Sequence, residues 1–299
     1  MSAQVRKLKI AVILTVVLSL AFVVMVPASS AVGILLKVGP EGLPLPHSDF
    51  STVSQSVVED ATRLAAEVYG SSPKEHNDFV HQLLAAYLEV KDEDFVVIFN
   101  SGGWGWNILE ASPQWTSIFI GIRSELADLG YTSLLLNYQR ASDTIGGYFA
   151  EFMSMISLYP SQANDLANSI EFLTKHITDL RVIIVGESTG TIIADSVMSL
   201  LRDNPRVYSI QTGPPFWHKN TTLERTLVLK SNGLTPDYFS QGDILTLVCA
   251  NLEALFGFSQ AGTGKILVYL QAPGHEYWWQ DPEVYSQITS FLQQNFRFE

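Results

Sequence analysis

The fold of this chain is decided by the stretch 182–190, which reads Val-Ile-Ile-Val-Gly-Glu-Ser-Thr-Gly. Its first four residues are apolar and β-branched, which predicts a buried strand, and the apolar spacing from Thr191 to Leu201 predicts a helix. The turn between them has the pattern G-x-S-x-G. Such a turn strains the backbone of the serine, and the glycines avoid clashes that side chains would cause. We therefore expect Ser188 to be a nucleophile exposed at the carboxyl edge of a sheet, although a plain β–α turn would use glycines in the same way.

After residue 94 the chain alternates between short β-rich runs and helical patterns. Two further helical patterns lie before residue 94. The strands are expected at about Phe95 to Phe99, Thr132 to Leu136, Val182 to Val185, Val207 to Gln211, Thr226 to Leu229 and Ile266 to Leu270. The helices are expected at about Ser54 to Tyr69, Glu75 to Leu88, Trp115 to Leu129, Pro160 to Ile177, Gly190 to Arg202, Asp243 to Phe256 and Pro282 to Phe296. Continuous apolar strands are buried on both faces, so the sequence predicts a mostly parallel central sheet flanked by helices.

A glycine-rich stretch, Asn-Ser-Gly-Gly-Trp-Gly at 100–105, follows the first of these strands. Together with the G-x-S-x-G turn it resembles the α/β-hydrolase family, whose order along the chain is oxyanion loop, nucleophile, acid and histidine. The resemblance covers roughly residues 94 to 299 and departs from the family pattern at Asn100, where a histidine is often found. It implies an α/β-hydrolase fold with an oxyanion hole made of main-chain N–H groups, those of Gly103 or Trp104 and of Thr189. The run 131–140, which ends in Asn-Tyr-Gln-Arg, is similar to the next family strand, and no catalytic role follows from it.

A serine nucleophile needs a base whose pKa lies near neutrality, and the chain has six histidines. His275 comes just after the last expected strand, where the family has its histidine. His47, His76 and His81 lie at positions that the family order does not use. His176 lies on a polar helix face, and His218 follows a strand, where it could line a substrate pocket. We therefore expect His275 to be the base; the alternative is an ordinary histidine on a surface loop.

Two aspartates are candidates for the acid that orients the imidazole, because both follow the strand at Thr226 to Leu229. Asp237 is closer to the end of that strand. Asp243 directly precedes a helix, an arrangement similar to the family's acid, and its interval of 32 residues to the histidine fits the family better than the 38 of Asp237. We favour Asp243 and keep Asp237 as the alternative, since an aspartate before a helix is also an ordinary N-cap.

An almost purely aliphatic segment at residues 10–26 follows a basic stretch at residues 6–9. As a signal peptide it would be cleaved after Ala31; as an uncleaved anchor it would be prolonged by the apolar residues 32–36. We favour the anchor, because about 17 apolar residues exceed the roughly 7 to 15 usual in signal peptides. The preceding positive charge places the N-terminus in the cytoplasm, so the body is membrane-anchored on the extracytoplasmic side, or secreted if cleaved.

The expected organisation is a signal anchor or signal peptide at 1–37, a linker rich in proline and glycine at 38–50, and one α/β-hydrolase domain at 51–299. The connection from Gln211 to Thr226 is too short for a large cap domain. Residues 141–159 are rich in apolar side chains, and we expect a short flap there over the site.

The resemblance implies a serine hydrolase that cleaves a carboxylic ester through an acyl-enzyme, with no cofactor and no metal. Membrane proximity and the apolar flap suggest an acyl-ester or lipid substrate. A peptidase or acyltransferase would use the same triad, and a catalytically silent, membrane-tethered binding domain would keep the fold without the chemistry.

Composition narrows the class of partner. The net charge is −12, and the chain after residue 40 carries all 30 acidic side chains but only 14 of the 18 basic ones. Such a body repels phosphate backbones, which argues against nucleic acid as a partner. The single cysteine, Cys249, has no partner for an intramolecular disulfide, and we expect it to be a small core residue.

Overall fold

The computed structural model describes residues 34–37, 49–70, 72–103, 105, 112–140, 151, 153–219, 221, 223–255 and 272–297. Within these ranges one sheet has the strand order β1-β3-β2-β4-β5-β6. Its strands are β1 (Ile34–Lys37), β2 (Phe95–Asn100), β3 (Ser133–Gln139), β4 (Arg181–Glu187), β5 (Val207–Thr212) and β6 (Thr226–Leu229). Neighbouring strands are parallel except β1, which pairs antiparallel with β3. The expectation of a mostly parallel sheet is confirmed.

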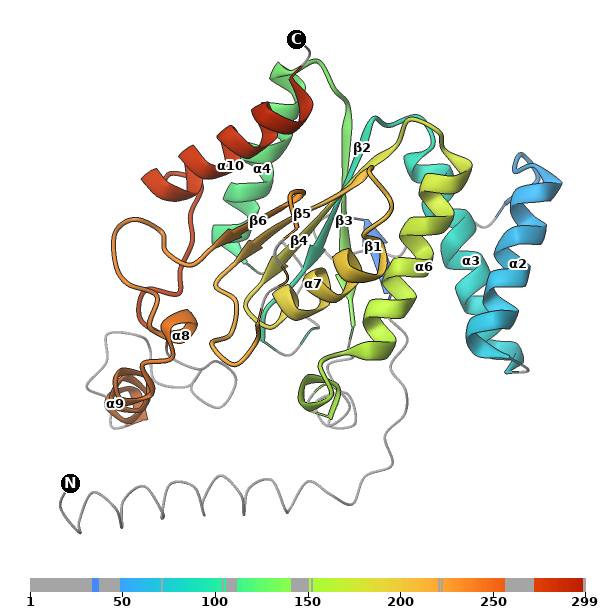
Figure 1. Ribbon diagram of the computed structural model, residues 1–299. Coiled ribbons are helices and arrows are strands. Elements are labelled where there is room, and N and C mark those ends of the chain that lie inside the picture. The colour runs from blue at the N-terminus through green and yellow to red at the C-terminus, as the bar shows by residue number, and fades with distance from the viewer. Residues whose placement is uncertain are drawn as a thin grey trace.

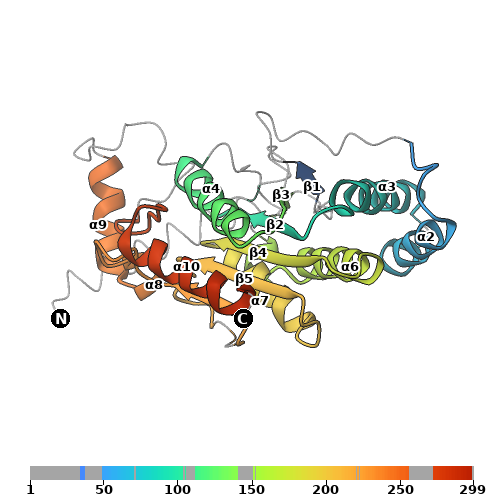
Figure 2. The ribbon, with the colours of Figure 1, turned by 90° about the horizontal axis from the view of Figure 1, so that it is seen from above.

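Helices cover both faces of this sheet (Figure 1). They are α2 (Gln55–Tyr69), α3 (Pro73–Val90), α4 (Pro113–Asp128), α6 (Pro160–His176), α7 (Gly190–Leu200), α8 (Tyr238–Gln241), α9 (Ile244–Leu255) and α10 (Pro282–Phe296). Helices α4 and α10 lie on one face, and α3, α6 and α7 on the other, with α2 outermost (Figures 1 and 2). The flanking helices begin and end within three residues of the expected bounds, whereas the short α8 was not expected.

Strands β2 and β4 are largely apolar because their side chains enter the cores on both faces of the sheet. In β2, Val96 and Ile98 pack into the core under α3, α6 and α7. Phe95, Val97 and Phe99 pack into the core under α4 and α10. Since side chains alternate between the faces of a strand, a strand with a helix layer on each side buries nearly all of its side chains, polar ones such as Asn100 and Gln211 included.

Strand β1 is a departure from the expected organisation. Residues 34–36 were expected to prolong the apolar membrane segment, yet they pair with β3, and the side chain of Leu35 is only 4% exposed. A short apolar run is compatible with either environment, and periodicity alone does not distinguish them. The sheet therefore begins before the expected linker.

Several expectations fall on residues outside the described ranges. These are the aliphatic segment at 10–26, most of the linker, the first part of the flap and the strand at 266–270. In the ranges that are described, no helix combines the length and the apolarity needed to cross a bilayer. Cys249 is exposed on α9, so its expected place in the core is wrong.

The strand order places a switch point between β2 and β4. Strand β3 follows β2 along the chain and lies on one side of it, and the chain then returns so that β4 lies on the other side. The loops that leave the carboxyl ends of β2 and β4 therefore diverge to opposite faces. In open α/β sheets, ligands bind in the crevice at such a point, which directs attention to Asn100–Gly105 and Glu187–Gly190.

Replacing Leu35 with alanine tests whether β1 belongs to the folded domain. In a chain that starts at residue 27, we expect Leu35→Ala to lower the free energy of unfolding in urea by about 2 kcal/mol or more, because a buried leucine is lost. Leu200→Ala is the matched control, since that side chain is 52% exposed at the end of α7 and its loss should cost less than about 0.5 kcal/mol. Equal stability of the two variants would contradict the strand.

Candidate active site

Ser188 lies on the turn from β4 into α7 in a strained backbone conformation. Its φ is +49°, in the left-handed region that side chains other than glycine rarely adopt. The Ser188 N–H donates to the carbonyl of Thr212 at 2.9 Å, which ties the turn to the end of β5. The side chain is half-buried at the carboxyl edge of the sheet, at the switch point.

The two glycines of the motif are required by close packing. A Cβ at Gly190 would lie 2.2 Å from the carbonyl oxygen of Asn100, at the end of β2. A Cβ at Gly186 would lie 2.8 Å from the Cα of Thr191. Contacts this short leave no space for a methyl group. The turn can hold Ser188 between β2 and α7 only with glycine at both positions.

His275 forms its hydrogen bond with Asp237. Its Nδ1 lies 2.9 Å from Asp237 Oδ2, and the side chains are 16% and 0% exposed. A carboxylate only accepts, so Nδ1 carries the proton, and in the neutral ring Nε2 is then the acceptor. Nε2 is buried and has no hydrogen-bond partner among the described residues. The imidazole is therefore oriented at one nitrogen and able to accept a proton at the other.

Asp237 is built to stay ionised. Burial would raise its pKa, but the hydrogen bond and charge of His275, together with Tyr277 and Ser240, hold the pKa below its ordinary value. Its Oδ1 accepts the N–H groups of Phe239 and Ser240, and its Oδ2 accepts the hydroxyls of Ser240 at 2.8 Å and Tyr277 at 2.7 Å. A carboxylate with this many donors retains its charge out of water.

Asp243, the favoured acid, does not contact His275. It accepts the N–H of Thr246 at 3.1 Å and its hydroxyl at 2.8 Å, as the residue before α9. The N-cap interpretation thus describes Asp243, and the preference between the two aspartates is reversed. The reason is a contact between two loops: Gly274 packs against Pro236 so closely that a Cβ would lie 2.0 Å from its carbonyl oxygen, which brings the histidine loop onto the residues before Asp237.

Gly213 places the imidazole beside the serine turn. A Cβ on Gly213 would lie 2.4 Å from His275 Cε1 and 3.2 Å from Asp237 Oδ2, so only glycine admits the ring. The preceding residue, Thr212, is the acceptor of the Ser188 N–H. The end of β5 therefore contacts both the histidine–aspartate pair and the strained serine, and keeps them in one neighbourhood.

The glycine-rich loop after β2 lies against Ser188. A Cβ on Gly102 would lie 3.0 Å from Ser188 Cβ. The Gly102 N–H donates to Glu187 Oε2 at 3.2 Å, whereas the N–H groups of Gly103 and Thr189 have no acceptor among the described residues. These two groups are the described members of the expected oxyanion hole; Trp104 lies outside the described ranges.

Glu187, Gly213, Tyr277 and Arg140 line this site without having been predicted. Burial raises the pKa of Glu187, and the Gly102 N–H and the nearby charge of His275 offset the rise only in part. Glu187 occupies a variable position of the G-x-S-x-G motif, so the sequence pattern did not indicate a role for it. Arg140 did give one, since it ends the run that resembles a family strand, and its partners are described below.

Aromatic side chains lie beside His275. Phe239 contacts His275 edge to face with ring centroids 4.7 Å apart, and Trp217 contacts Phe239 at 5.4 Å. Large apolar side chains exposed on the β5–β6 connection, the acid loop, α9 and the segment 153–158 are Phe216, Trp217, Leu234, Ile244, Leu245, Met153, Ile156 and Leu158. The last three belong to the expected flap. Within the described ranges, no group of three or more His, Cys, Asp or Glu side chains could hold a metal ion.

Comparisons with known proteins add little to this geometry. No protein-family model matches the chain, and no curated protein matches it. Among solved structures, the chain is similar to Trichoderma reesei cutinase in complex with a C11Y4 phosphonate inhibitor, with 15% sequence identity over 81% of this chain and 99% of that one and a TM-score of 0.44. A likeness this distant carries no argument, so the function must be inferred from the chain's own residues.

The pairing of His275 with Asp237 predicts a deshielded Nδ1 proton in the NMR spectrum, because a hydrogen bond to a buried carboxylate is short and strong. We expect this resonance to disappear in Asp237→Asn and to persist in Asp243→Asn. His275→Gln assigns it, since His218 also contacts an aspartate, Asp195, at 3.1 Å. Loss of the signal in Asp243→Asn but not in Asp237→Asn would restore Asp243 as the acid.

Proposed function

We propose that this protein is a serine hydrolase that cleaves a carboxylic ester, with Ser188 as nucleophile, His275 as base and Asp237 as the acid that orients it. The observation that carries the proposal is the convergence at the switch point of a strained serine and a histidine with a free, buried Nε2, held by a fully bonded aspartate. A structural turn would require none of this strain, and strained backbone concentrates at functional sites.

The chemistry follows from the positions of these groups. His275 Nε2 takes the Ser188 hydroxyl proton while Oγ attacks the ester carbonyl carbon, and the carbonyl electron pair moves onto oxygen. The N–H groups of Thr189 and the loop at Gly103 stabilise that oxyanion. The adduct collapses to an acyl-enzyme, and the leaving alkoxide takes the proton from the imidazolium. Water, deprotonated by His275, then attacks the acyl carbon. Collapse of this second adduct releases the acid, and the imidazolium returns the proton to Ser188 Oγ.

Asp237 stabilises the imidazolium and stays ionised throughout, because its donors hold its pKa below the ordinary value. Glu187 also lies near His275, and its carboxyl group accepts the Gly102 N–H. Both carboxylates are held by main-chain N–H groups, so neither has to reorganise during the reaction.

The exposed apolar side chains around the site favour an acyl ester or lipid as substrate. Phe239 contacts His275, Trp217 packs on Phe239, and Phe216 packs on Trp217, so these rings offer contact area for an acyl chain and few polar partners. A peptide substrate would need acceptors and donors for its backbone, which these side chains lack. An ester with an apolar acyl group is therefore the substrate class that we infer.

Fluorophosphonate labelling tests the proposal directly. We expect wild type to be labelled and Ser188→Ala not to be, because the reagent phosphonylates an activated serine. Ser199→Ala is the matched control, since Ser199 is exposed on the same helix α7. Absence of labelling in folded wild type would contradict the hydrolase and favour a silent binding domain.

The labelled protein can then be offered nitrophenyl esters of increasing acyl length and peptide amides. Hydrolysis that rises with acyl length supports the ester assignment. Hydrolysis of peptides with no esterase activity would identify a peptidase, and acyl transfer to an added alcohol in preference to water would identify an acyltransferase.

We further propose that residues 10–26 anchor the protein in a membrane with the α/β domain on the extracytoplasmic side. Positive charge precedes this aliphatic run, and only the seven residues 27–33 separate it from β1. So short a connection would keep the site near the lipid surface. Cleavage after Ala31 would leave β1 intact as well, so the sheet accommodates either outcome.

Membrane extraction distinguishes the two forms. Expressed from its first residue, the protein should resist carbonate extraction from membranes, and mass spectrometry should find residues 1–31 still attached. Leu18→Arg should weaken membrane retention, because arginine at the centre of a span costs about 3 kcal/mol. A soluble product that begins at Val32 would overturn the anchor and support secretion.

A further inference from the structure

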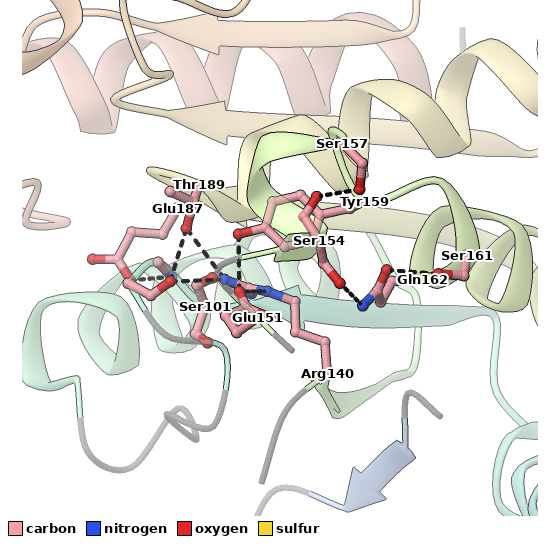
Figure 3. A network of polar contacts seen from close by, with 12 residues as sticks. Ser101, Arg140, Glu151, Ser154, Ser157, Tyr159, Ser161, Gln162, Glu187 and Thr189 are labelled. Carbon is pink, nitrogen blue, oxygen red and sulfur yellow. Dashed lines mark hydrogen bonds and ion pairs between the residues drawn. The ribbon is translucent and has the colours of Figure 1, made fainter. Parts of the chain in front are cut away.

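Arg140, which follows β3, is a charged residue with no exposed surface (Figure 3). Its side chain is 0% exposed, and its Nε–H donates to Glu151 at 2.8 Å, a carboxylate that is itself 2% exposed. Tyr159 supports the pair: its hydroxyl donates to the same Glu151 oxygen at 2.9 Å, and its ring lies 5.2 Å from the guanidinium. Burying an ion pair gains little stability over apolar packing, so its presence calls for another explanation.

The remaining guanidinium N–H groups reach the two segments that carry the expected oxyanion donors. Nη1–H donates to the carbonyl of Ser101, and Nη2–H donates at 3.2 Å both to the carbonyl of Gly103 and to the hydroxyl oxygen of Thr189. The Thr189 hydroxyl donates in turn to the Gly103 carbonyl at 3.1 Å. One side chain thus connects the loop after β2 to the residue that follows the nucleophile.

These bonds set the direction of the loop's N–H groups. In a trans peptide the carbonyl of one residue and the N–H of the next point to opposite sides. Arg140 holds the Ser101 carbonyl, and the Gly102 N–H of the same peptide points the other way, to Glu187 beside Ser188. A cation on the carbonyl side therefore fixes the Ser101–Gly102 peptide, whose N–H is held by Glu187 beside Ser188, and with it the backbone that leads into Gly103.

The loop is also shaped around the Arg140 side chain. Gly105 has φ +77°, its carbonyl accepts the Arg140 N–H at 3.0 Å, and a Cβ there would lie 2.5 Å from Arg140 Cγ. On the other side of the guanidinium, Tyr159 is fully buried with φ +56°, a strained conformation for a residue other than glycine. Gly105 and Tyr159, which both contact the Arg140 side chain, thus both have a left-handed backbone conformation.

We propose that Arg140, anchored by Glu151, is a positioning residue that fixes the oxyanion donors of Gly103 and Thr189 relative to Ser188. The inference rests on the proposed function. Arg140 does not touch the substrate; it acts through the carbonyls and the hydroxyl that it holds. Lysine at this position keeps the charge but lacks the planar fork that bonds three acceptors and Glu151 together.

Arg140→Lys tests this inference, with Arg206→Lys as the matched control. Arg206 also donates to main-chain carbonyls, those of Thr174, Ile177 and Thr178, at the opposite end of the sheet. With esterase rates expressed per labelled site, we expect Arg140→Lys to lower kcat about 10- to 100-fold and leave KM within about threefold, because a misplaced donor is lost only in the transition state. Arg206→Lys should retain the wild-type kcat.

The affinity for a trifluoromethyl ketone provides a second readout, which a change in folding stability alone would not alter. The ketone forms a tetrahedral oxyanion adduct with the serine, so its affinity should fall by the same factor as kcat/KM in Arg140→Lys. If Arg140→Lys does not fold, Thr189→Val removes the bridging hydroxyl and should show the same pattern, with Thr174→Val on α6 as its control. Unchanged kcat and inhibitor affinity in these variants, with wild type active, would overturn the positioning role alone; inactive wild type would instead overturn the proposed function.

Discussion

The close approach of the β4–α7 turn to the end of β2 is the constraint on which the site depends. At Gly190 the backbone of the turn lies so near the carbonyl of Asn100 that no side chain fits between them. This contact forces the left-handed conformation of Ser188 and brings the glycine-rich loop beside it. It exists because β2 and β4 are neighbours while β3 lies on the far side of β2, so the order of the strands creates the crevice that the chemistry would use.

What could be predicted from the sequence was local. The G-x-S-x-G turn, its strand and its helix depend on residues adjacent in the chain, and apolar runs such as 95–99 identify strands buried on both faces. Strand β1 was missed because three apolar residues beside an aliphatic segment fit a membrane as well as a sheet edge. The flanking helices were predictable because each has one apolar face toward the sheet.

His275 pairs with Asp237 and not with the favoured Asp243, because this pairing depends on how two distant loops pack. An interval of 32 or 38 residues counts chain length, whereas the pairing is set by Gly274, which lets the histidine loop lie on Pro236. Both aspartates accept main-chain N–H groups at the start of a helix, so the local pattern is the same for each. Only Asp237 also accepts hydrogen bonds from Tyr277 and His275, and the spacing of residues along the sequence indicates neither bond.

The buried pair of Arg140 and Glu151 limits which substitutions this protein can accept as its sequence evolves. Loss of either partner would leave the other as an uncompensated charge in the interior, at a cost of about 3 to 5 kcal/mol. Most folded domains have little more stability than that in reserve. The two positions therefore form an epistatic pair, and in any lineage that descends from this sequence they must be retained together or exchanged together. The loop that Arg140 holds is constrained along with them.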